Sequence, residues 1–196
     1  MNKNDKDLHG TFGAKMKAPV HQDYAVEADT ARGLMADLRA ALMPSQTARR
    51  LIDMADEQGV VTQFIRGREE TAYVPEFKTV FITITPQTRA TPRLALMYAG
   101  ALREAEQNIL GLKRPGPEAD DDTWMTQHAV KNVDVIKYVC WIVRDIMELN
   151  PESTEFLDTL TTFGHNEIYK ALTDGASDED LLRLYAHQGS INIKEG

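Results

Sequence analysis

Apolar and small residues recur every three or four positions between Asp23 and Met43, a spacing typical of an amphipathic helix with one buried face. We expect this helix to end near Pro44. A second helix is predicted from Ser45 to Glu57, because the Ser45 hydroxyl can accept hydrogen bonds from the free amides at a helix start. Gly59 can adopt the left-handed conformation that commonly ends a helix. The first third of the chain therefore predicts a helical hairpin.

Three short segments rich in β-branched and aromatic residues follow, and this composition is typical of strands. They are Val60 to Ile65, Thr71 to Pro75 and Lys78 to Ile84. The connection between the first two is short enough for an antiparallel hairpin. The third carries enough apolar residues to be the most buried of the three. We therefore predict a small antiparallel sheet of about three strands.

Helical patterns return after the strands. Thr91 and Pro92 are a strong helix start, because Thr can cap free amides and Pro at the first helical position loses no hydrogen bond. This helix is expected to reach about Leu110, and a loop is expected from Lys113 to Asp122. A long helix from Thr123 to Leu149 has the clearest helical period in the chain, so we expect it to be central.

The last part of the chain is predicted to contain further helices. One begins after Asn150 and Pro151. Another runs to about His187 from a capping box formed by Ser177 and Asp180. The tail from Gly189 to Gly196 either pairs as a short strand or stays loose.

This order of elements, two helices, a small sheet and then four or five helices, predicts a mostly helical α+β fold. Residues 1–22 mix Lys, Asp, Asn and Gly with almost no apolar periodicity, so we expect a flexible N-terminal arm. Residues 23–196 are expected to form a single globular domain. A chain of 196 residues is long enough to bury roughly 70% of the surface that it exposes when unfolded.

Charge and composition exclude several classes of protein. The formal net charge is −8, and no basic cluster is visible, which argues against binding to nucleic acids or to anionic membranes. No run of 18 apolar residues and no apolar segment of signal-peptide type occurs, so we expect neither membrane spanning nor secretion. The single cysteine, Cys140, lies in an apolar helical run and is interpreted as a buried residue of a cytoplasmic protein.

The segment from Thr91 to Leu110 has the frame of a metallopeptidase active-site helix. In zincin-like metallopeptidase families, including bacterial families of unknown function, this helix reads approximately Leu-Ala-His-Glu-Leu-Arg-His-Ala-Trp-Gln. The chain resembles these families over about residues 25 to 150, in the order of its elements and in four residues of this helix. The four residues are Leu102, Arg103, Ala105 and Gln107. The resemblance implies a zincin-like arrangement of the helices and the sheet.

The same alignment places Gly100 and Glu104 at the two histidine positions and Ala101 at the position of the catalytic glutamate. Two histidines four residues apart bind zinc from one helix face, and the glutamate deprotonates the metal-bound water. Gly100 offers no ligand, Ala101 offers no base, and Glu104 alone binds a cation only weakly. We therefore assign no catalytic residue, no metal and no cofactor. The leading hypothesis is a catalytically inactive, metallopeptidase-like protein that binds a protein or a peptide in the substrate groove.

Two other hypotheses remain open. A metal-dependent hydrolase with a rearranged site would use Glu104, His128 and Asp134, although Asp134 is also explained as an ordinary solvated residue off the apolar stripe of its helix. A helical interaction or oligomerisation module would explain the acidic surface and the N-terminal arm. Gly100 in turn is explained by the close approach of a neighbouring helix.

A further pair of polar residues, His165 and Glu167, is interpreted as helix-capping or packing, with a shared ligand as the alternative. The sequence identifies neither a partner nor an oligomeric state.

Overall fold

The computed structural model describes residues 26–112 and 120–194. The predicted flexible arm, residues 1–22, lies outside the described residues, as do positions 113–119 of the predicted loop. The elements in chain order are α1 (Ala28–Leu42), α2 (Gln46–Glu57), β1 (Val61–Arg66), β2 (Glu70–Val74), the 3-10 helix η2 (Pro75–Phe77), β3 (Thr79–Ile84), α3 (Pro92–Ile109), α4 (Asp121–Leu149), α5 (Glu155–Thr162), α6 (Asn166–Thr173) and α7 (Asp178–Lys194).

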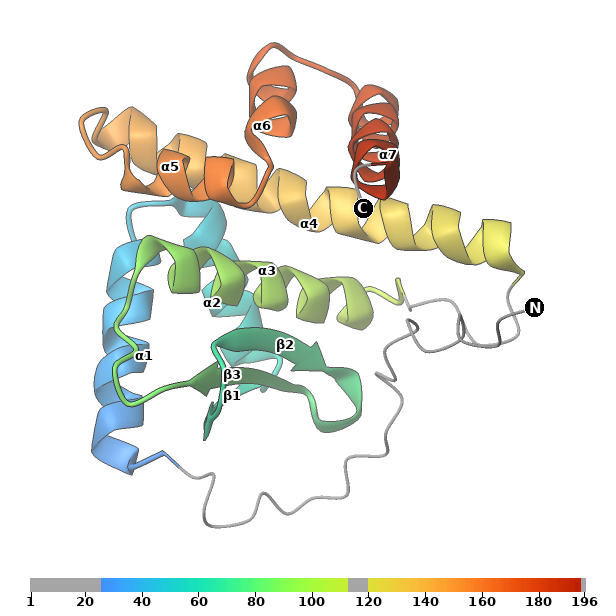
Figure 1. Cartoon of the computed structure of the whole chain (residues 1–196). Coiled ribbons are helices and arrows are strands. Elements are labelled where there is room, and N and C mark those ends of the chain that lie inside the picture. Colours follow the sequence, from blue (N-terminus) through green and yellow to red (C-terminus); the bar gives the residue numbers. More distant parts are fainter. Residues whose placement is uncertain (1–25, 113–119, 195–196) are drawn as a thin grey trace.

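The predicted α+β class is confirmed, with helices dominating and one three-stranded sheet. The elements form layers, in which α3 lies between the sheet and the long helix α4 (Figure 1). Helix α3 packs against β2, β3 and α4, and α4 also contacts α2, α6 and α7. The prediction that the long helix is central is therefore confirmed.

The sheet is mixed, which corrects the prediction of an antiparallel sheet. The strand order is β1-β3-β2, so the first two strands do not form a hairpin with each other. Strand β1 runs parallel to β3, with Val61 opposite Thr79, and β2 runs antiparallel to β3, with Tyr73 opposite Val80. The third strand is the most buried, as predicted, because its central place gives it a neighbouring strand on each side.

One face of the sheet supplies the core beneath α3. Its members are Phe64, Tyr73, Val80, Ile82 and Ile84. They join the buried faces of the helices in one cluster, in which the fully buried large side chains include Leu38, Leu51, Leu94, Tyr98, Leu102, Ile142, Leu160 and Leu181. The cluster fixes α3 against the sheet and so determines which side chains of α3 point elsewhere.

Two predicted helix starts carry the expected caps. The Ser45 hydroxyl accepts a hydrogen bond from the Ala48 amide at 3.0 Å, and the Thr91 hydroxyl accepts one from the Leu94 amide at 3.2 Å. Ser45 also donates to the carboxylate of Asp145 on α4 at 2.7 Å, which ties the start of α2 to the central helix. The predicted capping box is confirmed by reciprocal hydrogen bonds between Ser177 and Asp180.

Several element ends differ from the predictions. Helix α4 begins at Asp121, two residues early, because the Asp120 side chain accepts a hydrogen bond from the Thr123 amide at 2.9 Å and so acts as the cap. Helix α5 begins at Glu155 rather than directly after Pro151, because a turn closed by the Ser153 amide and the Asn150 carbonyl intervenes.

The tail is helical where it is described, which corrects both alternatives proposed for it. Helix α7 continues past His187 to Lys194, and residues 195–196 lie outside the described part. Among the described helices, none combines the length and the apolar character that crossing a lipid bilayer requires.

Candidate functional site

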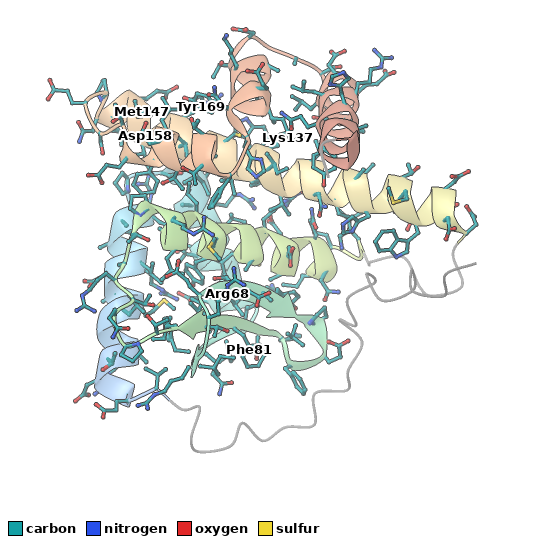
Figure 2. The ribbon with its side chains drawn as sticks, viewed as in Figure 1. Arg68, Phe81, Lys137, Met147, Asp158 and Tyr169 are labelled. Carbon is teal, nitrogen blue, oxygen red and sulfur yellow. The ribbon has the colours of Figure 1, made fainter. Side chains whose placement is uncertain are left out.

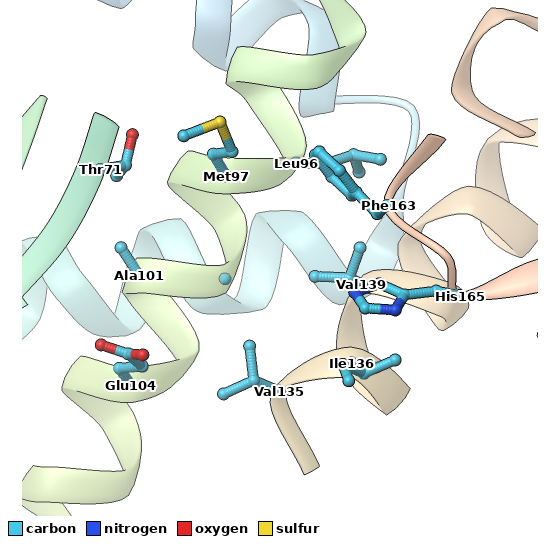
Figure 3. Close-up of a pocket in the computed structure, with 11 residues that line it drawn as sticks. Thr71, Leu96, Met97, Ala101, Glu104, Val135, Ile136, Val139, Phe163 and His165 are labelled. Atoms are coloured by element: carbon cyan, nitrogen blue, oxygen red, sulfur yellow. The ribbon is translucent and has the colours of Figure 1, made fainter. Parts of the chain in front are cut away.

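A cavity of about 210 Å³ opens between α3, α4, β2 and the connection from α5 to α6 (Figure 3). The three positions at which the zincin-like resemblance places the metal ligands and the base, Gly100, Ala101 and Glu104, all lie on its wall. They face it from α3, whose other side is packed in the core. The remaining lining residues are Thr71, Leu96, Met97, Val135, Ile136, Val139, Phe163 and His165.

The cavity wall is mostly apolar, with three polar side chains. The Glu104 carboxylate reaches it from α3, the His165 imidazole from the start of α6, and the Thr71 hydroxyl from β2 (Figure 3). The Thr71 hydroxyl is buried and has no hydrogen-bond partner among the described residues. An unmade hydrogen bond of this kind costs about 1–3 kcal/mol, and the buried oxygen is not accessible from the cavity.

Burial lowers the pKa of His165, and this effect outweighs the opposing influence of the backbone at Gly164. The lowered pKa favours the neutral imidazole near pH 7, which offers one donor and one acceptor. The ring also lies 5.9 Å from the Phe163 ring, centroid to centroid. The side chain makes no capping hydrogen bond at the start of α6, so the packing interpretation holds and the capping one does not. Glu167 is exposed and does not line the cavity.

Gly100 faces α4, but the close approach of that helix does not require a glycine. A Cβ atom at this position would lie 3.4 Å from the Val135 side chain and 3.8 Å from the Val139 side chain. Both distances are ordinary van der Waals contacts. The interpretation of Gly100 as a packing requirement is therefore wrong.

Asp134 does not lie in the cavity, and it is not the solvated residue of the alternative interpretation. Its carboxylate accepts hydrogen bonds from Arg103 Nε and from Gln107 Nε2, both at 2.7 Å. Arg103 also pairs with Glu106, which in turn accepts a hydrogen bond from Arg50 Nη2 at 3.0 Å. We call these five residues, Arg50, Arg103, Glu106, Gln107 and Asp134, the ionic cluster.

The ionic cluster joins α2, α3 and α4. Arg103 and Glu106 are each 7% exposed, and the Arg103 guanidinium lies 3.9 Å above the Tyr138 ring. Two cations and two carboxylates balance one another here, which is the condition for burying charges at tolerable cost. The ionic cluster therefore has a structural role. It fixes helix α3, which forms one wall of the cavity.

His128 lies neither in the cavity with Glu104 nor in the ionic cluster with Asp134. Its ring stacks on that of Trp124 with centroids 4.7 Å apart, and its Nε2 atom lies 3.0 Å from the amide nitrogen of Asn132. That amide also donates to the Tyr185 hydroxyl on α7 at 3.0 Å. Over residues 26–112 and 120–194, no group of three or more His, Cys, Asp or Glu side chains is positioned to hold a metal ion.

Cys140 is fully buried, and burial raises the pKa of its thiol to about 12. The thiolate is therefore scarce at neutral pH, and the residue packs as an apolar side chain.

Comparisons of the chain with protein-family models, with curated proteins and with solved structures found no match. The zincin-like resemblance therefore stays a prediction.

Proposed function

We propose that this protein is a catalytically inactive, metallopeptidase-like binding protein that holds a peptide segment in the cavity beside α3. The observation that carries the proposal is the position of the cavity. Gly100, Ala101 and Glu104 stand at the aligned ligand and base positions, and all three open onto it. The small side chains at two of these positions leave room where a zinc peptidase would hold its metal and water.

The dimensions favour a side chain of a longer ligand. At about 210 Å³ the cavity is smaller than the roughly 300–1,000 Å³ typical of sites that enclose a whole small molecule. One of its walls comes from β2, which lies at an edge of the sheet. An extended peptide can pair with the backbone of such an edge strand and insert one side chain into a neighbouring hollow.

The lining indicates what that side chain looks like. Leu96, Met97 and Val139 favour an apolar stem, whereas the neutral His165 ring supplies a hydrogen bond for a polar end. The Glu104 carboxylate adds a negative charge at the cavity wall. A side chain with an apolar body and a donor at its end matches this lining.

The proposal is tested by selecting peptides from a phage-displayed random library on the full chain. Enriched peptides are labelled, and their dissociation constants are measured by fluorescence anisotropy. We expect Ala101→Leu, which fills the cavity, to weaken binding at least tenfold. The matched control is Ala40→Leu, which makes the same change at an exposed position of α1 and should leave the affinity unchanged.

Because Ala101→Leu adds volume at a buried position, its folding is checked by urea unfolding. His165→Phe provides a second variant, in which an aromatic ring without hydrogen-bonding nitrogens replaces the imidazole at the cavity. Peptides that bind both variants as tightly as the wild type, or a failure to select any peptide, would contradict the proposal.

The rival function, a metal-dependent hydrolase, is tested by measuring the metal content of the protein. Tag-free protein purified without chelators is analysed for metals by elemental mass spectrometry, beside the Glu104→Ala variant. Asp134 is left intact in this comparison, because its removal disturbs the ionic cluster. One transition-metal ion per chain that disappears in the variant would favour the hydrolase over the proposed binding function.

A further inference from the structure

The side of the sheet that faces away from α3 carries an apolar surface of its own. Strand alternation places Phe81 of β3 opposite in direction to Val80 and Ile82, which lie in the core (Figure 2). The register brings the side chains of both neighbouring strands onto the same side. We call this surface the open sheet face, and its apolar members are Val61, Ile65, Ala72, Val74 and Phe81.

The open sheet face is not covered by the described helices. None of its five apolar side chains belongs to the hydrophobic core cluster or packs against it, as far as residues 26–112 and 120–194 are concerned. Val61 is 57% exposed, whereas Ile65, Ala72, Val74 and Phe81 are half-buried. The same face also carries the polar side chains Gln63, Thr79 and Thr83. A sheet normally has such a face covered by another layer.

The area of this surface limits what can cover it. Three strands about 4.8 Å apart and about 20 Å long present a footprint of roughly 300 Å². A stable interface between two copies of a chain needs about 800 Å² on each side. The open sheet face is therefore too small to hold a dimer by itself, and it matches the footprint of a single extended segment.

The chain contains a segment with the matching pattern, outside the described residues. In the stretch FGAKMKAPV, residues 12–20, the side chains of Phe12, Ala14, Met16, Ala18 and Val20 alternate with Gly, Lys, Lys and Pro. In an extended conformation this period of two places the five apolar side chains on one side and both lysines on the other. The prediction of a flexible arm rested on the near-absence of apolar periodicity over residues 1–22 as a whole, and residues 12–20 are the exception to it.

We propose that residues 12–20 of this chain bind the open sheet face in an extended conformation, with their apolar side on Phe81 and its neighbours. Only five residues, 21–25, lie between Val20 and Val26, which packs against the core, and the six steps from one Cα atom to the next span up to about 20 Å. Helix α1 begins at the lower edge of the molecule, on the side to which the open sheet face is turned (Figure 1). A tether of this length keeps the segment at an effective concentration on the order of millimolar.

The charges around the open sheet face do not select an occupant. Residues 1–22 contain four lysines and two aspartates, whereas the whole chain carries a net charge of −8. Glu70, on the side of β2 that belongs to the open sheet face, is exposed, and so is Glu76 in η2. Arg66, Arg68 and Lys78, which adjoin the same strands, are exposed as well, so the border of the sheet is mixed in charge.

The proposal is tested by disulfide trapping in the full chain. Ala72→Cys places one thiol on the open sheet face with little change in volume. It is combined in turn with Ala14→Cys, Lys15→Cys, Met16→Cys or Lys17→Cys. Cys140 does not compete, because its thiol is buried and has a pKa of about 12. Intrachain disulfide after mild oxidation at low protein concentration is quantified by non-reducing electrophoresis and mass spectrometry.

We expect the yield to alternate along the four positions. Ala14→Cys and Met16→Cys should cross-link at least fivefold more efficiently than Lys15→Cys and Lys17→Cys. Similar yields at all four positions would overturn the proposal, since they would show that no fixed side of the segment faces the sheet. Disulfides between chains, in an amount that rises with protein concentration, would overturn it in favour of a second copy as the occupant.

Discussion

Arg103 on α3 and Asp134 on α4 form a hydrogen-bonded ion pair at 2.7 Å, although 31 positions separate them in the sequence. The Arg103 side chain is 9% exposed and that of Asp134 is 22% exposed, so the pair is largely shielded from water. It connects the helix that lines the candidate site to the central helix of the fold.

Removing one member of this pair should be costly. Asp134→Ala leaves the buried Arg103 guanidinium with Glu106 alone, and we expect the free energy of unfolding to fall by about 2–3 kcal/mol. Urea denaturation followed by circular dichroism measures the change. The control is Glu179→Ala, which breaks an exposed pair with Arg183 and should cost at most about 0.5 kcal/mol. Equal effects of the two substitutions would show that the ionic cluster contributes no more than a surface pair.

Gly100→Ala should stabilise the protein by about 0.5–1 kcal/mol, because alanine has a higher helix propensity and its Cβ atom meets only ordinary contacts. The increase in the midpoint of urea unfolding measures this gain. Gly67→Ala is the contrasting substitution, since its Cβ atom would lie 2.6 Å from Cγ2 of Thr83 and must displace it. A loss of stability in Gly100→Ala would mean that α3 and α4 are closer than described.

The ionic cluster also predicts acid sensitivity. Burial alone would raise the pKa of Glu106, but hydrogen bonds from Arg50 and Arg103 outweigh it and hold the pKa below its ordinary value of 4.5. A carboxylate with a lowered pKa contributes stability that is present above pH 4.5 and is lost as the pH falls through its value in the folded protein.

We therefore expect the free energy of unfolding to decrease steadily below about pH 4.5. Glu106→Gln should lower stability at pH 7 and flatten this acid limb, whereas the exposed substitution Glu152→Gln should leave both unchanged. Urea titrations between pH 3 and pH 7 give the two curves, and an acid limb that is equally steep in Glu106→Gln would exclude Glu106 as its source.

Ser45→Ala should reduce the free energy of unfolding by about 1–2 kcal/mol, because the fully buried hydroxyl both caps α2 and donates to Asp145. Thr91→Ala removes a cap at an exposed position and should cost only about 0.5–1 kcal/mol. The difference between the two variants in thermal or urea unfolding contains the contribution of the hydrogen bond to Asp145 together with that of the burial of Ser45. Identical losses would show that this bond adds nothing.

The helices were predictable because the physics that starts and ends them is local. Ser45, Thr91 and Ser177 cap amides within three residues of themselves, and a period of 3.6 residues is read from consecutive positions. Strand pairing, in contrast, depends on contacts between segments that are distant in the sequence. The strand segments were identified by their composition, but nothing in them indicated that β3 would separate β1 from β2.

The candidate site shows the same limit. The alignment of one helix placed Gly100, Ala101 and Glu104 together, and they do share a cavity wall. Thr71 and His165 also line the cavity, although they lie 33 positions before and 61 positions after Glu104 in the sequence. No sequence pattern predicts that residues so far apart come together. Asp134 was interpreted as solvated, because a charged residue outside the apolar stripe of a helix is usually exposed to water. In the structure it is instead paired with Arg103 on α3 and largely shielded from water.

The strand order has a consequence for how the chain reaches this fold. The central strand is the last of the three to be synthesised, so β1 has no partner until Ile84 has emerged from the ribosome. Strands β2 and β3, joined through η2, can form their antiparallel pair within microseconds, whereas the parallel docking of β1 must close a loop of twelve residues between its end and Thr79. We infer a folding sequence in which the β2–β3 pair forms first and β1 completes the sheet in a slower, non-local step.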